Sequence, residues 1–396
     1  MKMKNLKEQA IELHRKHMGK IDVASKIEIH SQEDLSLVYT PGVGDVCKEI
    51  ERKPEELNQL TSRGNMVAVV TDGTAVLGLG DIGPGAAMPV MEGKCMLFKN
   101  FANINAFPLC LDTKEVDEIV AIVKALQPTF AGINLEDISA PRCFEIEERL
   151  KKELDIPVFH DDQHGTAIVV LAGLINALKV VGKQMKQVKI VINGAGAAGI
   201  SIAKLLLEAG FSNITLVSLE GAVHHREPWL NSSQQKIAKV TNKGDIRGTL
   251  DDVIQGTDVF IGVSGPAALN KEQVKRMEKD PIVFAMANPI PEIHPEDAFA
   301  AGAKVVGTGR SDYPNQVNNL LAFPGIFRGA IDSAASDITV EMKIAAAYAI
   351  AKVIPEKELS AKYVIPNALN KDVPKVVADA VKKCVLEKGD INARTS

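Results

Sequence analysis

The sequence of 396 residues has few cysteines and no paired-cysteine motif. Its five cysteines are odd in number, and no two of them have the CxxC spacing. These features argue against a disulfide framework and against a zinc site built from thiolates. We therefore expect reduced and mostly buried thiols at all five positions: Cys47, Cys95, Cys110, Cys143 and Cys384.

The sequence also lacks a strongly basic region. Lys and Arg number 46 against 50 Asp and Glu, which gives a formal net charge of −4. No basic run is dense enough to indicate nucleic-acid binding, so we expect a small-molecule substrate as the partner. Residues 1–20 are charged throughout and contain no apolar run for a signal peptide or a membrane span. We expect them to form a polar helix, and we expect a cytoplasmic protein with no membrane partner.

The hydrophobic pattern predicts two α/β domains. With 46% hydrophobic and 24% charged residues, the chain is long enough for two cores. From residue 66, short apolar runs alternate with helical ones, as in parallel βαβ units. The predicted strands of a first series lie within 66–72, 106–112, 129–138 and 156–162, with helices at 116–126 and 141–154. Those of a second series lie within 187–199, 213–221, 257–265, 281–289 and 303–309.

A helical segment at 164–182 joins the two series. We therefore predict an N-terminal α/β domain over residues 1–160. It is followed over 161–396 by a Rossmann-like, doubly wound domain that ends in a helical segment.

The stretch "INGAGAAG" has the GxGxxG spacing directly after a predicted strand and before a predicted helix. In this context the motif indicates a dinucleotide site for NAD or NADP. We expect Gly194 to permit the tight turn, Gly196 to let the backbone approach the pyrophosphate, and Gly199 to allow close helix packing. Ala197 and Ala198 belong to the same cofactor-binding loop. A glycine-rich turn in another doubly wound sheet is the alternative, which this context disfavours.

The choice between NAD and NADP depends on the end of the next strand. An acidic residue there would bind the adenosine ribose of NAD, but this sequence has Ser218. Without a carboxylate at Ser218 nothing repels a 2′-phosphate, and His224, His225 and Arg226 could supply positive charge. Alternatively these three form an ordinary solvated loop, and Glu220 binds the ribose. The sequence leaves both possibilities open.

Four carboxylates follow two predicted buried strands: Glu136, Asp137, Asp161 and Asp162. Parallel strands bring their carboxyl ends to one edge, so these side chains are expected to converge in a cleft. Like charges placed so closely require a cation, and all-oxygen ligands favour Mg²⁺ or Mn²⁺ over zinc. Alternatively, Glu136 or Asp137 and also Asp162 could cap the helices that follow. Capping would explain two of the four carboxylates.

Other polar residues lie in apolar surroundings. Lys94 lies inside an apolar helix, where burial is expected to lower its pKa and make it a base near neutral pH. The alternative is an ion pair with Glu92 or with a carboxylate of the cleft. Tyr39 precedes a Pro-Gly turn and is either functional or a half-buried core ring. Three asparagines offer amides to a ligand or cap the backbone locally: Asn288, Asn318 and Asn319.

Taken together, the motifs of this chain resemble the malic enzymes of the compact bacterial type. The motifs agree in order and spacing and extend from about residue 15 to about residue 385: "LVYTPGVG", "VTDGTAVLGLGDIGPGAAMPVMEGKCMLFK", "NLEDI", "PVFHDDQHGTA", "NGAGAAG", "ANPIPEI" and "NQVNNLLAFPG".

The resemblance implies a role for each candidate residue. It implies metal ligation by Glu136, Asp137 and Asp162, with Asp161 beside them. Tyr39 matches the general acid and Lys94 the general base. The residues that bind the substrate and the nicotinamide match the three asparagines: Asn288, Asn318 and Asn319.

The resemblance implies oxidative decarboxylation of L-malate to pyruvate and CO₂, with reduction of NAD or NADP and dependence on Mg²⁺ or Mn²⁺, in a homodimer. Malolactic decarboxylation to lactate with retained NAD is the alternative. A non-catalytic NAD sensor would have no use for Tyr39, Lys94 and the carboxylates together. One position departs from the larger eukaryotic members, because Ala75 stands where they carry an arginine for the substrate carboxylate.

Overall fold

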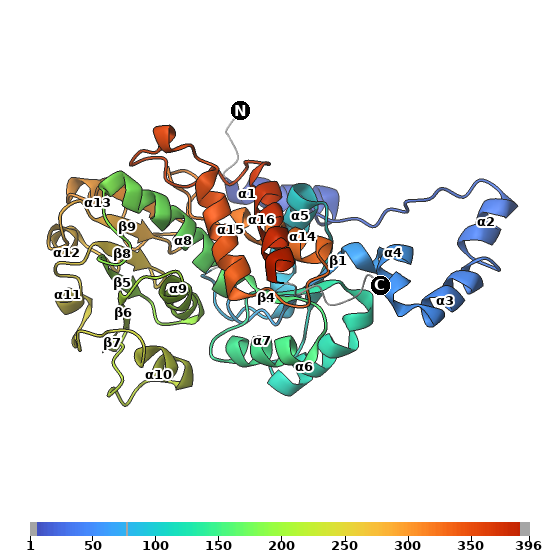
Figure 1. The fold of residues 1–396 in the computed structure, drawn as a ribbon, viewed down its shortest axis with the longest axis horizontal. Coiled ribbons are helices and arrows are strands. Elements are labelled where there is room, and N and C mark those ends of the chain that lie inside the picture. The colour runs from blue at the N-terminus through green and yellow to red at the C-terminus, as the bar shows by residue number, and fades with distance from the viewer. Residues whose placement is uncertain (1–5, 77, 389–396) are drawn as a thin grey trace.

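The protein contains two separate, mainly parallel β-sheets in a computed structural model that describes residues 6–76 and 78–388 (Figure 1). The strand order is β2-β1-β3-β4 in the first sheet and β10-β9-β8-β5-β6-β7 in the second. The second order is that of a doubly wound dinucleotide-binding sheet, whose halves diverge between β5 and β8. The predicted α/β class and the Rossmann-like second unit are confirmed.

Each predicted strand segment contains an observed strand, except that β2 begins one residue before its predicted segment. The first sheet consists of β1 (Met66–Thr71), β2 (Asn105–Cys110), β3 (Gly132–Leu135) and β4 (Val158–His160). The second consists of β5 (Lys189–Asn193), β6 (Asn213–Ser218), β7 (Gly221–Ala222), β8 (Val259–Gly262), β9 (Ile282–Ala285) and β10 (Val305–Thr308). The prediction missed only β7, a short antiparallel strand whose two residues carry no periodicity.

The first sheet is covered by helices on both faces because its residues alternate. Val67 and Val69 of β1 belong to the core shared with α5 (Pro84–Ala102), whereas Ala68 and Val70 pack on the side of α6 (Val116–Ala125) and α7 (Arg142–Glu153). Successive side chains of a strand point to opposite faces, so both faces of β1 are buried. The predicted helices at 116–126 and 141–154 are thereby confirmed.

The long helix α8 (Asp161–Val181) passes from the first sheet to the second and packs against α9 (Ala197–Glu208). Among the described residues, α8 alone is long and apolar enough to cross a membrane. However, 72% of its most apolar window is buried inside the protein. It therefore serves as a core helix between the two sheets.

Shorter helices surround the second sheet. They are α10 (Ser232–Ala238), α11 (Leu250–Val253), α12 (Lys271–Lys275) and α13 (Pro295–Ala300). The chain then leaves this sheet through the 3₁₀ helix η4 (Asn319–Leu321) and forms α14 (Phe323–Asp332), α15 (Val340–Lys352) and α16 (Val373–Lys388). Helices α14 and α16 pack against α5 of the first unit. The C-terminal helices thus complete the core of both units, and the boundary after residue 160 stays a prediction.

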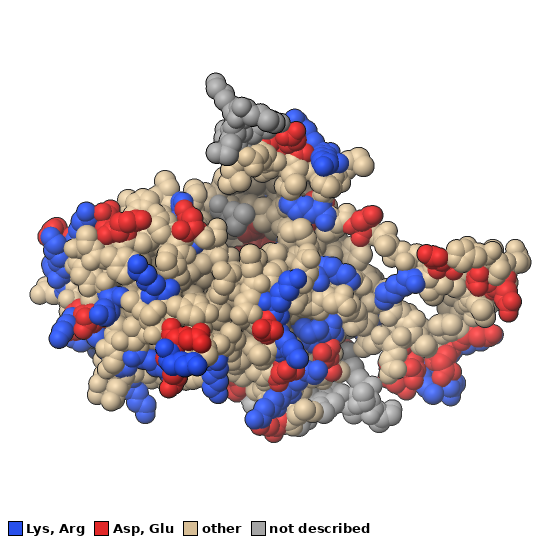
Figure 2. All heavy atoms as spheres, turned by 90° about the horizontal axis from the view of Figure 1, so that it is seen from above, with Lys and Arg blue, Asp and Glu red and all other residues tan. Residues whose placement is uncertain are grey.

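Residues 20–60 form an N-terminal arm, of which α2 (Gln32–Val38) and α3 (Val43–Arg52) extend away from the sheets while α4 (Leu57–Leu60) lies beside β1 (Figure 1). The arm follows α1 (Leu6–His17), which confirms a helix in the charged N-terminal segment. None of the three helices of the arm has a buried residue. The projecting end carries several acidic side chains, while the face shown in Figure 2 otherwise mixes both signs of charge.

All five cysteines are free. Their burial differs from the prediction of mostly buried thiols. Cys95 and Cys143 are buried, Cys110 and Cys384 are half-buried, and Cys47 on the arm is exposed.

Candidate active site

Four carboxylates gather at the carboxyl edge of the first sheet. Glu136 and Asp137 directly follow β3, and Asp161 and Asp162 begin α8 directly after the neighbouring strand β4. One carboxylate oxygen from each of Glu136, Asp137 and Asp162 lies within 4.8 Å of the others. The predicted convergence is therefore present, and it follows from the parallel pairing of β3 with β4.

Helix capping does not explain these carboxylates. The N-cap residue of α7 is Pro141 and that of α8 is His160, and neither helix has a side-chain cap. Asp162 instead accepts a hydrogen bond at Oδ2 from the backbone N–H of Asp137, at 2.8 Å. This bond links the end of β3 to the first turn of α8, so it holds two of the carboxylates together.

Burial, and to a lesser extent mutual repulsion, raises the pKa values of three of these carboxylates. Burial raises the pKa of Asp137 to about 9, and the neighbouring Asp162 and Glu136 add to the effect. Burial also raises the pKa of Glu136 and of Asp161, although Lys94 opposes the rise in both. The buried Oδ2 of Asp137 and Oδ1 of Asp161 have no hydrogen-bond partner among the described residues. Buried carboxylate oxygens without donors fit a hard divalent cation.

Lys94 connects the cluster to α5. Its Nζ lies 2.6 Å from Oδ2 of Asp161 and 2.8 Å from Oε1 of Glu136, and 4.4 Å from the centre of the Phe323 ring. Of the two alternative ion-pair partners, the cleft carboxylates are thus the ones observed. The expected lowering of the Lys94 pKa is wrong. Burial lowers this pKa, but Asp161 and Glu136 outweigh burial and raise it above its ordinary value.

Two neighbours fix the orientation of the carboxylates. A Cβ on Gly165 would lie 1.9 Å from Oδ1 of Asp161, so only glycine lets that carboxylate lie against the first turn of α8. Asn134 on β3 donates a hydrogen bond to Oε1 of Glu136 at 2.9 Å. Asn134 was not among the residues predicted from the sequence. Its signal was a polar side chain inside an otherwise apolar strand.

The three candidate asparagines occupy different positions. Asn319 donates a hydrogen bond from its amide to Oδ2 of Asp161, which places it at the cluster. Asn318 caps η4, because its Oδ1 accepts the backbone N–H of Leu320 at 2.9 Å. Asn288 is exposed after β9. A Cβ on Gly78 would lie 2.7 Å from the Asn288 carbonyl oxygen, so loops of the two units meet there.

Tyr39 is not brought to the cluster within this chain. It ends α2 on the arm and is 66% exposed. Its hydroxyl makes no hydrogen bond to any described residue. The alternative of a half-buried core ring is therefore excluded.

The glycine-rich loop lines a cavity of about 530 Å³ at the carboxyl edge of the second sheet. Gly194 has φ of +122°, as a tight turn requires, and a Cβ on Gly199 would lie 1.8 Å from the Gly194 carbonyl oxygen. Gly196 has open space beside it and forms the N-cap of α9. The geometry fits a tight turn at Gly194 and close packing at Gly199, whereas pyrophosphate binding beside Gly196 stays a prediction. Ala197 and Ala198 form the first turn of α9.

Side chains beyond the loop also line this cavity, and the sequence analysis did not select them. Asn193 ends β5 and donates a hydrogen bond to the Ser264 hydroxyl at 2.9 Å. Both residues line the cavity, together with Asn231 and Gln234 at the start of α10. Polar residues directly after strand ends were the available signal.

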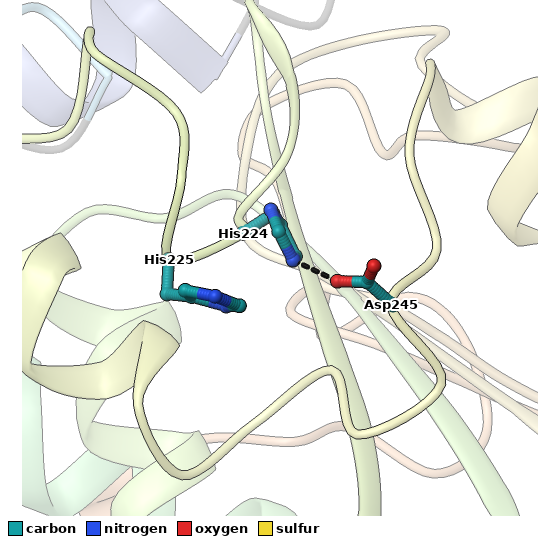
Figure 3. A group of neighbouring side chains, drawn as sticks. All are labelled: His224, His225 and Asp245. Carbon is teal, nitrogen blue, oxygen red and sulfur yellow. Dashed lines mark ion pairs between the residues drawn. The ribbon is translucent and has the colours of Figure 1, made fainter.

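The basic residues after β7 lie outside the lining of this cavity, whereas Ser218 is part of it. His224 is buried and forms an ion pair with Asp245, and the His225 ring lies close by (Figure 3). Ser218 donates a hydrogen bond from its hydroxyl to Glu220. Glu220 does not line the cavity either, so the choice between Glu220 and the basic residues stays open.

Comparison with known proteins agrees with this geometry. Residues 18–151 match the family profile "Malic enzyme, N-terminal domain", and residues 163–386 match "Malic enzyme, NAD binding domain". The chain is 59% identical to a bifunctional malic/malolactic enzyme of Bacillus subtilis over 97% of this chain and 94% of that protein. It is 60% identical to an NAD-dependent malic enzyme of Geobacillus stearothermophilus over 94% of this chain and 77% of that protein.

A solved structure shares the fold as well. The crystal structure of an NAD-dependent malic enzyme from Thermotoga maritima superposes with a TM-score of 0.91 at 51% identity, covering 94% of this chain and 98% of that one. The two family profiles together match most of the chain. This protein therefore belongs to the malic enzyme family.

Proposed function

We propose that the protein oxidises L-malate with NAD or NADP and decarboxylates it to pyruvate and CO₂, with Mg²⁺ or Mn²⁺ as the metal. One observation carries the proposal. Lys94 and Asp161 are in direct contact beside three converging carboxylates at the carboxyl edge of the first sheet. The family to which the chain belongs supports the same reaction.

Glu136, Asp137 and Asp162 are the residues proposed to hold the divalent cation. They supply only oxygen ligands, and Asp137 keeps a buried oxygen without a donor. When bound, the cation would polarise the substrate oxygens and stabilise the enolate charge that develops as CO₂ leaves. Asn134 would then act by orienting Glu136 through its 2.9 Å hydrogen bond.

Proton transfer is assigned to Lys94 and Asp161. Because the Lys94 pKa is raised, Lys94 would pass a proton to Asp161 through their 2.6 Å hydrogen bond as it takes up the proton of the malate C2 hydroxyl. Asn288, Asn318 and Asn319 are assigned to the substrate carboxylates and the nicotinamide amide. They also take over carboxylate recognition from the absent arginine, because Ala75 offers only a methyl group.

A direct assay tests the reaction. Purified protein with L-malate and Mn²⁺ should reduce NAD and release pyruvate in equal amounts, and chelation of the metal should stop both. Absence of pyruvate, or full activity in a chelator, would contradict the proposed reaction or its metal dependence respectively.

Tyr39 is proposed to reach the site of a second protomer, where it protonates C3 of enolpyruvate. Its own site lacks it, and the arm that carries it leaves apolar side chains uncovered: Val23, Ile27, Ile29 and Leu37 are each more than half exposed. Apolar surface of this kind is buried in homodimers, and two-fold symmetry makes the exchange of arms reciprocal. A homodimer is therefore part of the proposal.

Complementation between two inactive variants tests this arrangement. Y39F and K94A protomers, mixed and allowed to exchange, form heterodimers in which one of two sites carries both Tyr39 and Lys94 if the arm acts in trans. When equal amounts are mixed, about half of the dimers are heterodimers, and half of the sites in these are complete. About a quarter of the wild-type activity should then return. If Tyr39 acts within its own chain, every site keeps one defect and no activity returns.

Malolactic decarboxylation is the second candidate, since the Bacillus subtilis relative is named a bifunctional malic/malolactic enzyme. In that reaction the chain would retain NADH after decarboxylation and pass the hydride to pyruvate. Lactate formed from malate without net NADH would support it. Pyruvate and NADH in equal amounts would support the first candidate.

For the nucleotide, we infer that both NAD and NADP are used, with NAD preferred. The Ser218 hydroxyl positions Glu220 at the end of β6, where its carboxylate could accept the ribose hydroxyls and repel a 2′-phosphate. His224 is engaged with Asp245 and is not free to bind that phosphate (Figure 3). Ratios of kcat/KM for the two nucleotides measure the preference.

We also propose a cytoplasmic location. All five cysteines are free, although Cys47 is exposed. Free thiols are typical of a reducing compartment. Detection of the protein in the soluble fraction of lysed cells, with its five thiols titratable in denaturant, tests this assignment.

A further inference from the structure

A second cavity lies on the opposite side of α8 from the carboxylate cluster. It has a volume of about 390 Å³ and is lined by residues of α7, α8, α9, α10 and α15. Asp161 and Asp162 belong to the carboxylate cluster, and Gly165 lies against Asp161. The residues between them, Gln163 and His164, line this cavity instead. Successive residues of an α-helix are rotated by about 100°, so neighbouring residues of α8 face different sides of the helix. The cavity is therefore separate from the proposed reaction site.

One buried nitrogen donor in this cavity lacks a hydrogen-bond partner, and a largely buried lysine lacks an ion-pair partner among the described residues. Gln163 is 2% exposed and its Oε1 accepts the Ser201 hydroxyl at 3.3 Å, but its Nε2 has no partner. Lys343 is 5% exposed and forms no hydrogen bond or ion pair with another described residue, and the Phe159 ring lies 6.0 Å from its Nζ. Buried N–H groups without acceptors are costly and rare in folded proteins.

The acidic residues around the cavity do not satisfy these donors. Glu147 accepts a hydrogen bond from Nε2 of His164 at 2.7 Å, and Glu148 is paired with Lys152 at 2.6 Å. Glu208 lies on the exposed rim. Burial lowers the pKa of Lys343 to about 8, although Glu147 partly opposes the shift. The ammonium group is thus largely withdrawn from water at the wall of the cavity, without a carboxylate of any described residue in direct contact.

Further positive charge surrounds the same space. Lys204 on α9 and Lys236 on α10 line the cavity from its rim, and neither has an ion-pair partner among the described residues. Lys151 also lines it and is paired with Asp337 at 2.8 Å. Three lysines and one amide from four different helices therefore point their donors into a space of metabolite size.

We propose that this cavity is a binding site for a small molecule carrying a phosphate group. A phosphate offers several strong acceptor oxygens, enough to engage Lys343, the Gln163 amide and the two rim lysines together. The ligand is either inorganic phosphate or a small phosphate monoester. Because Gln163 follows Asp162 directly on α8, an occupied site stabilises the turn that carries a proposed metal ligand.

Calorimetric titration of the complete protein tests the site. NAD is kept at a saturating concentration so that phosphate cannot bind at the N-terminus of α9 in the dinucleotide cavity. Divalent metal and malate are omitted. Inorganic phosphate up to about 20 mM should then bind in the millimolar range or tighter. Titration of glycerol 3-phosphate in the same way distinguishes a phosphate monoester from inorganic phosphate as the ligand. Tighter binding of the ester identifies a phosphorylated metabolite, and equal or weaker binding identifies phosphate itself.

Matched variants locate the binding. K343M should weaken phosphate binding at least about tenfold, and K236Q by a few fold, because each removes one charged donor. K239Q is the control, since Lys239 is an exposed lysine at the end of α10 that does not line the cavity. NAD binding and melting temperature confirm that each variant folds. No binding to the NAD-saturated protein, or equal binding by K236Q and K239Q, would overturn the proposal. Neither result depends on malate turnover.

Discussion

The carboxyl edges of the two sheets carry opposite kinds of chemistry. At the first edge the side chains matter, because Glu136, Asp137 and Asp161 are buried together with raised pKa values. At the second edge the backbone matters, because Gly194 and Gly196 leave room for a ligand beside α9. Both edges arise from the same parallel topology. The comparison teaches that the topology sets where a site forms, whereas residue type sets what the site does.

If the carboxyl edge of the first sheet carries the reaction, removal of the Lys94 side chain should nearly abolish turnover and leave nucleotide binding intact. K94A should lower kcat by about 10³-fold or more, because proton transfer and the ion pairs to two carboxylates are lost together. NAD affinity, measured by fluorescence titration, should stay within about twofold of wild type. K124A, which removes an exposed lysine paired with Glu153, is the control. A K94A enzyme with normal kcat would remove Lys94 from the mechanism.

Loss of one carboxylate charge at this edge should have the next largest effect. D162N should weaken activation by Mn²⁺ about 100-fold, because a charged ligand becomes a neutral one. The control is D112N, which changes an exposed aspartate after the neighbouring strand β2. The Mn²⁺ concentration that gives half-maximal activity is the measurement. An unchanged value for D162N would contradict the assignment of the metal ligands.

Two glycine variants should separate packing from ligand access at the second edge. G199A should lower the free energy of unfolding by about 1–3 kcal/mol, because its Cβ would overlap the Gly194 carbonyl oxygen. G196A should leave stability nearly unchanged and weaken NAD binding, since its Cβ would enter open space at the cavity. Denaturant unfolding and NAD titration give the two quantities. Equal behaviour of the two variants would refute the distinct roles.

The smallest expected effect concerns nucleotide choice. E220Q should shift the ratio of kcat/KM values towards NADP by about 1 kcal/mol, because one charge that repels the 2′-phosphate is removed. S218D, which adds a carboxylate, should shift the ratio towards NAD. E272Q, at an exposed glutamate paired with Lys275, is the control. If E220Q leaves the ratio unchanged, Glu220 does not contact the ribose.

The sequence predicted the architecture well because strands with continuous apolar runs are buried on both faces. The segment 66–72, for example, could only fit a covered parallel strand, and β1 lies within it. The gathering of Glu136 and Asp162 followed from strand direction alone. By contrast, β7 pairs over only two positions, which is too short for any periodic signal.

The electrostatics of the site depended on distances that no spacing reveals. Burial alone suggested a lowered pKa for Lys94, yet Asp161, which is 67 residues away in sequence, lies 2.6 Å from its Nζ. The position of Tyr39 relative to the carboxylate cluster could not be predicted from the sequence either. The motif around it fixes a turn, whereas the direction of the whole arm is a tertiary property that local residues do not encode.

The packing of α14 and α16 against α5 has a consequence for biosynthesis. Phe98 on α5 stacks edge-on against Phe323 and Phe327 of α14, with ring centres 4.7 and 5.3 Å apart. A ribosome adding 5–20 residues per second reaches α14 on the order of 10–30 s after it completes β4. During that interval α5 has left the exit tunnel while its apolar face around Phe98 is still uncovered. The nascent first unit is therefore a natural client for chaperones that bind exposed apolar segments, until the last helices arrive.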